Sequence, residues 1–144
     1  MSVHRKVKMK KQKIAFVFFI QALAQAALIV PSHAFDLAGA WAMEKATCPR
    51  VFTRNAASIA FAPESEQWGK GFIIEGNTIR GLSVKCVIKS KKETKSEINM
   101  IASCATDIMI DQVQLRFKIT GPNTITRMIS DGIESSFNRC EFLS

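Results

Sequence analysis

From about residue 35 onward, apolar and polar side chains alternate with a period of two, which is the spacing of β-strands. The alternation is clearest in three runs, at residues 82–88, 98–104 and 113–119. In each run, alternate apolar residues would share one face of a strand while Lys, Arg, Gln or Ser occupy the other. The pattern therefore predicts strands that bury one face and expose the other.

Turn residues at short intervals divide the rest of this region into further candidate strands. We expect these at residues 37–43, 58–62, 71–75, 124–129 and 134–142. Gly76-Asn77 is a two-residue hairpin signal, and Pro49 suits the first turn of a short helical segment near residues 48–52. No segment shows a long helical period, so the class expected is all-β.

Eight short strands joined mostly by tight turns predict a small antiparallel up-and-down barrel. Its last strand would return beside its first, which removes the open sheet edges. A two-sheet sandwich has the same periodicity and is the alternative. The inward positions are large, and an eight-stranded barrel is just wide enough for such side chains to fill it, which argues against a roomy cavity.

Residues 1–34 have the organisation of a secretory signal peptide. Six basic residues precede an apolar stretch from Ile14 to Val30, and Ser32-His33-Ala34 places small residues before a cut at Phe35. An uncleaved anchor is the alternative, but the apolar stretch falls short of the roughly 18 to 20 residues that span a bilayer. We expect a periplasmic or secreted protein whose single domain is 35–144, touching the membrane only through the signal before cleavage.

Removing the signal changes the charge and the available chemistry. The whole chain has 20 Lys+Arg and 12 Asp+Glu, and residues 1–34 hold six of the basic residues and none of the acidic ones. Residues 35–144 therefore have 14 basic and 12 acidic residues, a net charge of +2. Nucleic-acid binding is therefore not indicated. Both histidines, His4 and His33, also leave with the signal. Without an imidazole base or a Ser–His or Cys–His pair, we expect no enzyme and no catalytic residues.

All four cysteines, Cys48, Cys86, Cys104 and Cys140, lie in the exported part. An even number in a small exported domain predicts two disulfides. No metal or other cofactor is expected, because there is no CxxC pair and no His to complete a site. Cys86 and Cys104 share inward parity on neighbouring strands, about equally far from the intervening turn. Of the three available connectivities we expect Cys86–Cys104 and Cys48–Cys140.

Gly39-Ala40-Trp41 in the first expected strand resembles the G-x-W signature of lipocalin-like (calycin) barrels. In that family the Trp lies at the closed end of the barrel, and an Arg from near the last strand packs over its indole. The resemblance implies that Gly39, Trp41 and Arg139 form a barrel clasp, with Arg127 as the second choice for the arginine. The alternative is that Trp41 is an ordinary core residue.

Two further resemblances bear on function. The stretch 37–41 followed by Cys48 is similar to the start of small periplasmic metalloprotease inhibitors with a calycin-like barrel. The chain from Phe35 to Cys140, including 103–109, resembles a group of small exported proteins of alphaproteobacteria, which implies a compartment and no activity. Two functions are expected: a non-catalytic exported protein that binds a small apolar molecule, or a module that binds a periplasmic protein, such as an inhibitor of a periplasmic hydrolase.

Two surface features are candidate contact sites. The first is a basic hairpin tip whose only acidic residue is Glu93; its lysines are Lys85, Lys89, Lys91, Lys92 and Lys95. This tip would contact an anionic surface such as lipopolysaccharide. The alternative is that it is only solvated and protects the hairpin from aggregation. Ile108-Met109-Ile110 would contact a ligand or partner if it lies at the barrel rim. If the strand before it continues, these residues are core, which is the interpretation we favour.

Overall fold

A computed structural model describes residues 34–56 and 58–142 of the protein. The predicted signal peptide, apart from Ala34, lies outside the described residues. Within these ranges, no helix has both the length and the apolar character needed to cross a membrane.

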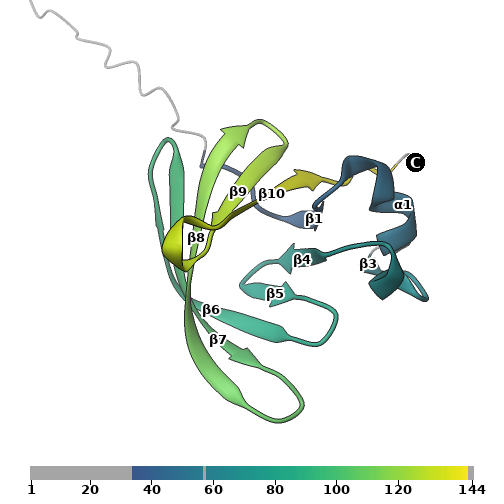
Figure 1. Ribbon diagram of the computed structural model, residues 1–144, viewed down its shortest axis with the longest axis horizontal. Coiled ribbons are helices and arrows are strands. Elements are labelled where there is room, and N and C mark those ends of the chain that lie inside the picture. The colour runs from purple at the N-terminus through teal and green to yellow at the C-terminus, as the bar shows by residue number, and fades with distance from the viewer. Residues whose placement is uncertain (1–33, 57, 143–144) are drawn as a thin grey trace, which may run out of the picture. The chain divides into compact units, whose positions relative to one another are not determined.

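Eight strands form a closed antiparallel barrel, in which β1 pairs with both β4 and β10 (Figure 1). The predicted all-β barrel is confirmed, with its last strand beside its first, and the sandwich alternative is wrong. Each other barrel strand pairs with its neighbours along the chain. The barrel strands are β1 (Gly39–Ala42), β4 (Gly71–Glu75), β5 (Thr78–Arg80), β6 (Lys85–Glu93), β7 (Glu97–Ala105), β8 (Ile110–Gly121), β9 (Thr124–Met128) and β10 (Glu134–Arg139).

The segment between β1 and β4 leaves the barrel. It contains α1 (Cys48–Val51), which confirms the predicted helical turn, and the two-stranded hairpin of β2 (Phe52–Asn55) and β3 (Ser58–Phe61). Short 3₁₀ turns at Lys45–Thr47 and Ser65–Gln67 precede α1 and follow β3, and a third lies at Ser130–Gly132. Figure 1 shows α1 and β3 at one side of the molecule, beyond β1 and β4.

The expected strand at 58–62 therefore exists, but the prediction that it belongs to the barrel is wrong. The eighth strand of the barrel is instead β5, which pairs with β4 through the two-residue turn at Gly76-Asn77. The run expected to be a strand from Leu82 begins only at Lys85, because Gly81 N donates to Val84 O at 2.8 Å and closes a turn. Leu82 lies in this turn and is 45% exposed.

The two faces of β1 enter two different cores. Trp41 points into the barrel and is fully buried, while Ala40 and Ala42 are buried on the outer face beneath Val51 and Phe52. The outer core is tight: a Cβ on Gly71 of β4 would lie 2.7 Å from Phe52 Cζ and 2.7 Å from Trp41 O. The small residues in β1 and β4 thus let α1 and the hairpin pack directly on the barrel wall.

Both predicted disulfides are present. Cys86 and Cys104 are directly paired residues of β6 and β7, with Cα atoms 3.9 Å apart. Cys48 at the start of α1 joins Cys140, just after β10, with Cα atoms 5.5 Å apart. The first disulfide staples one hairpin of the barrel, whereas the second fastens the outer segment to the end of the chain. Two intramolecular disulfides are compatible with an oxidising, exported environment.

Candidate ligand-binding cavity

The barrel has a filled end and a hollow end. Seven buried side chains contribute to the core but do not line the cavity described below: Leu37, Trp41, Ile74, Ile98, Met100, Ala102 and Ile125. Trp41 Nε1 donates to Leu37 O at 2.9 Å, so the segment before β1 lies across this end. The expectation of large inward side chains that fill the interior holds around Trp41, although Leu37, Ile74 and Met100 also border a second pocket of about 430 Å³ beside the segment before β1.

The other end holds a cavity of about 520 Å³. Its aromatic floor is Phe72 of β4 with Phe117 of β8 and Phe137 of β10; the Phe72 ring centroid lies 6.0 Å from that of Phe117 and 4.9 Å from that of Phe137. The Cys86–Cys104 disulfide forms part of the wall. The sequence-based expectation that large inward side chains leave no roomy cavity is therefore wrong for this half of the barrel. The three rings pack on one another at the floor and leave the space above them open.

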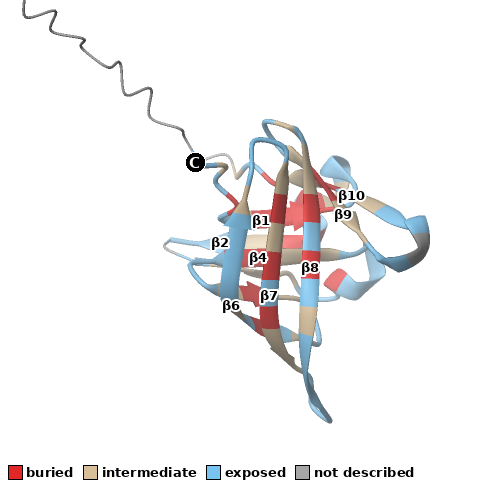
Figure 2. Cartoon of the chain, turned by 90° about the vertical axis from the view of Figure 1, so that its left-hand side faces the viewer, coloured by how far each residue is buried: buried red, intermediate tan, exposed pale blue. Residues whose placement is uncertain are grey.

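The mouth of this cavity lies where the β5–β6 and β7–β8 turns meet the solvent. Leu82 and Met109, one from each turn, line it. The rim interpretation of 108–110 holds and the favoured core interpretation is wrong, since Ile108 is 92%, Met109 58% and Ile110 78% exposed. Strand β7 ends at Ala105, where Thr106 N donates to Met109 O at 2.9 Å and turns the chain outward. Figure 2 shows exposed chain at the lower end of β7 and β8.

Three charged residues line the cavity: Arg127, Lys70 and Asp111. Arg127 of β9 faces inward because it pairs with Phe117 on one side and with Ser135 on the other. From the sequence, Arg127 is expected only as the second choice for the arginine of the clasp. Its inward parity was readable from the strand 124–129, where it alternates with Ile125. That parity alone could not reveal that the space in front of it is open.

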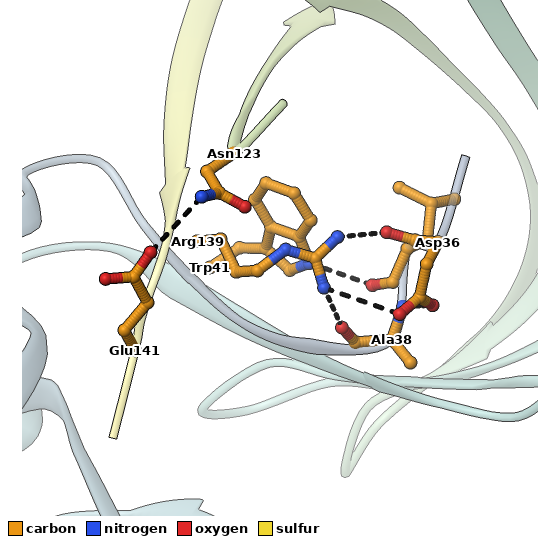
Figure 3. A network of polar contacts seen from close by, with 7 residues as sticks. Asp36, Ala38, Trp41, Asn123, Arg139 and Glu141 are labelled. Atoms are coloured by element: carbon orange, nitrogen blue, oxygen red, sulfur yellow. Dashed lines mark hydrogen bonds and ion pairs between the residues drawn. The ribbon is translucent and has the colours of Figure 1, made fainter. Parts of the chain in front are cut away.

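The clasp residues lie together at the filled end. The Arg139 guanidinium carbon is 4.6 Å from the Trp41 ring centroid, and Trp41 and Arg139 are directly paired across β1 and β10. Arg139 also donates to the carbonyl oxygens of Asp36 and Ala38, and its Nη1 lies 3.8 Å from Asp36 Oδ2 (Figure 3). Gly39 adopts φ +122°, and a Cβ there would lie 3.6 Å from Arg139 Nη1. The arginine thus holds both the indole and the segment that covers this end.

The five lysines do not share one hairpin tip, so that expectation is wrong. Strand β6 continues to Glu93 through a register shift between Ile88 and Ser90, and only Lys95 lies in the turn. Lys85 begins the strand at the opposite end, roughly 30 Å away at about 3.3 Å per residue. All five are exposed, and Lys91 pairs with Glu93 at 3.2 Å. They do not share one face either, because Lys91 pairs directly with the buried Met100 of β7 and lines a pocket beside Leu37. Most of β6 is pale, and so exposed, in Figure 2.

Several acidic side chains of the turns and of the cavity mouth are exposed to solvent. Glu64, Glu66 and Asp107 are exposed in turns, and Asp111 is exposed at the cavity mouth. Across the described ranges, no group of three or more His, Cys, Asp or Glu side chains is placed to hold a metal ion. The hollow end of the barrel is therefore the candidate functional site.

This site defines a class by its architecture: a small disulfide-linked antiparallel barrel, closed at one end by an arginine–tryptophan stack and hollow at the other. Compared with known proteins, the chain matches no family model, and no curated protein or solved structure matches it at a significant level.

Proposed function

We propose that this is a non-catalytic exported protein that binds a small, largely apolar molecule in the hollow end of its barrel. The cavity carries the proposal: its volume of about 520 Å³ falls within the range of roughly 300 to 1,000 Å³ typical of small-molecule sites. Its walls are mainly apolar and aromatic, with a few polar groups, which is the usual composition of such sites. The likeness of Gly39-Ala40-Trp41 to the lipocalin-like signature agrees with this function.

A cavity-filling substitution tests the proposal. Val113 lines the cavity from β8, so Val113→Phe places a ring in the ligand space; Val87→Phe on the exposed outer face of β6 is the matched control. We expect wild type to bind the neutral apolar fluorophore N-phenyl-1-naphthylamine. Val113→Phe should weaken binding about tenfold or more, equivalent to at least about 1.4 kcal/mol, with Val87→Phe unchanged.

The probe-binding results of wild type and the two variants distinguish a site inside the barrel from one outside it. Equal probe binding by both variants, or none by wild type, contradicts a site within the barrel. Thermal unfolding of each variant verifies that it is folded. Native mass spectrometry of protein purified from its own host then identifies any molecule bound in the cavity. A bound molecule of lipid mass that co-purifies with wild type but not with Val113→Phe supports the proposal.

A second candidate function is protein binding at the open end, favoured by the edge of β8. Residues Ile110–Leu115 pair with β7, but β9 pairs only from Arg116 onward, so within the described chain this half of β8 has a free edge. The exposed Ile108–Ile110 turn continues from it. An unpaired edge beside exposed apolar residues can accept an extended peptide as an added strand. Such a module would suit an inhibitor of a periplasmic hydrolase.

The rim supplies the test of this second function. A partner retained by wild type should be lost on Ile108→Ser, Met109→Ser and Ile110→Ser together. The matched control is Val87→Ser with Ile101→Ser, both exposed on the outer barrel wall. Equal retention by both variants, or none by wild type, contradicts a rim interface.

A further inference from the structure

Three arginines of the described chain are half-buried, and Arg127 differs from the other two. Arg80 donates to Ile59 O at 2.8 Å and to Glu75 Oε2 at 3.0 Å. Arg139 is held by its clasp contacts. Arg127 has no hydrogen bond or ion pair to another side chain or carbonyl within the described ranges, although it lines the cavity.

The surroundings of Arg127 leave its charge uncompensated. Its direct neighbours across the two ladders, Phe117 and Ser135, are neutral. Asp111 also lines the cavity, but it lies six residues from Phe117 along β8, or about 20 Å at roughly 3.3 Å per residue. Glu134 bonds Lys118 Nζ at 2.8 Å on the outer face. The third charged group in the lining, Lys70, is a second cation.

We propose, building on the proposed function, that the ligand is an anionic amphiphile whose carboxylate or phosphate group pairs with the Arg127 guanidinium. The guanidinium fork matches these groups with two parallel hydrogen bonds, and such charge-assisted bonds are stronger where the surroundings are apolar. The hydrocarbon part packs against the floor of Phe72, Phe117 and Phe137. A small inorganic anion would leave that floor unoccupied, and a purely apolar ligand would displace water from Arg127 without replacing its hydrogen bonds.

Ligands of one chain length with different headgroups test this assignment. Dodecanoate, dodecyl phosphate and dodecanol are titrated calorimetrically, below their aggregation concentrations, into the full exported domain with both disulfides formed. Wild type should prefer an anionic head over dodecanol by about tenfold to hundredfold, the factor that a charged hydrogen bond of roughly 1.5 to 3 kcal/mol supplies. A preference for either head supports the proposal, and their order identifies carboxylate or phosphate.

Arg127→Gln should abolish this preference while leaving dodecanol affinity within about twofold of wild type. Arg116→Gln, an exposed arginine on β8 outside the cavity lining, is the matched control and should retain the preference. Equal affinities for all three ligands in wild type, or a preference that survives Arg127→Gln, overturns the inference. Binding of dodecanol without any preference contradicts this inference alone, whereas binding of none of the three contradicts the proposed function as well.

Discussion

Arg139 and Trp41 are opposite each other in the β10–β1 ladder, and the guanidinium carbon of Arg139 lies 4.6 Å from the indole centroid. The same guanidinium donates to the carbonyl oxygens of Asp36 and Ala38. The contact therefore joins the two strands that close the barrel and, at the same time, fastens the segment that covers its filled end.

Removing this arginine should destabilise the barrel. Arg139→Ala loses a cation–π contact worth about 0.5 to 2 kcal/mol and hydrogen bonds that contribute roughly 1.5 to 3 kcal/mol when charged. We expect a loss of about 2 to 4 kcal/mol in the free energy of unfolding, measured by urea titration. Arg116→Ala, which removes an exposed arginine, is the control and should change stability by less than about 0.5 kcal/mol. Similar stabilities of the two variants would show that the clasp contributes nothing.

Gly39 should not tolerate a side chain, because its φ of +122° lies where only glycine is unstrained. We expect Gly39→Ala to lower the free energy of unfolding by about 1 to 3 kcal/mol through backbone strain. Gly121→Ala is the control, since a Cβ there meets Thr124 at an ordinary 3.6 Å. If Gly39→Ala unfolds at the same urea concentration as wild type, the strained conformation is not required.

The two disulfides should differ in their contribution to stability. Cys48–Cys140 closes a sequence separation of 92 residues, and Cys86–Cys104 closes one of 18. The chain-entropy model gives about 4 to 5 kcal/mol for the longer loop and about 3 kcal/mol for the shorter. Paired Cys→Ser variants, compared by urea unfolding, should therefore rank with loss of Cys48–Cys140 the more destabilising. The reverse order would mean that hairpin geometry, rather than loop length, governs the contribution.

The rim turn should be replaceable without loss of stability. Ile108, Met109 and Ile110 are exposed, so replacing all three with Ser should change the free energy of unfolding by less than about 1 kcal/mol. Met100→Ala is the contrasting substitution, because Met100 is 1% exposed and a buried Met→Ala change costs roughly 2 to 5 kcal/mol. A severe loss of stability in the triple variant would indicate that these three residues are part of the core.

The alternation of apolar and polar residues predicted much of this fold, because the buried face of a strand can be identified from the strand's own residues. The apolar positions of 98–104 and 113–119 identified two long strands and their inward faces. Shared parity, together with a similar distance from the intervening turn, paired Cys86 with Cys104. The pattern was less informative at 58–61 and 78–80, which are short. Which of them joins the barrel depends on Val51 and Phe52 covering the outside of β1, a contact between residues distant in sequence.

The sequence by itself determined the all-β class, the return of the last strand beside the first, and both disulfides, but one of its eight expected strands lies outside the barrel. These follow from side-chain periodicity, from the positions of Cys86 and Cys104 on adjacent strands, and from the pairing that this leaves for Cys48 and Cys140. Only the tertiary structure decided that half of the barrel is hollow, that Arg127 faces this space, and that 108–110 form an exposed rim. A cavity depends on how inward side chains from Phe72, Phe117 and Phe137 meet across the barrel, and no single strand contains that information.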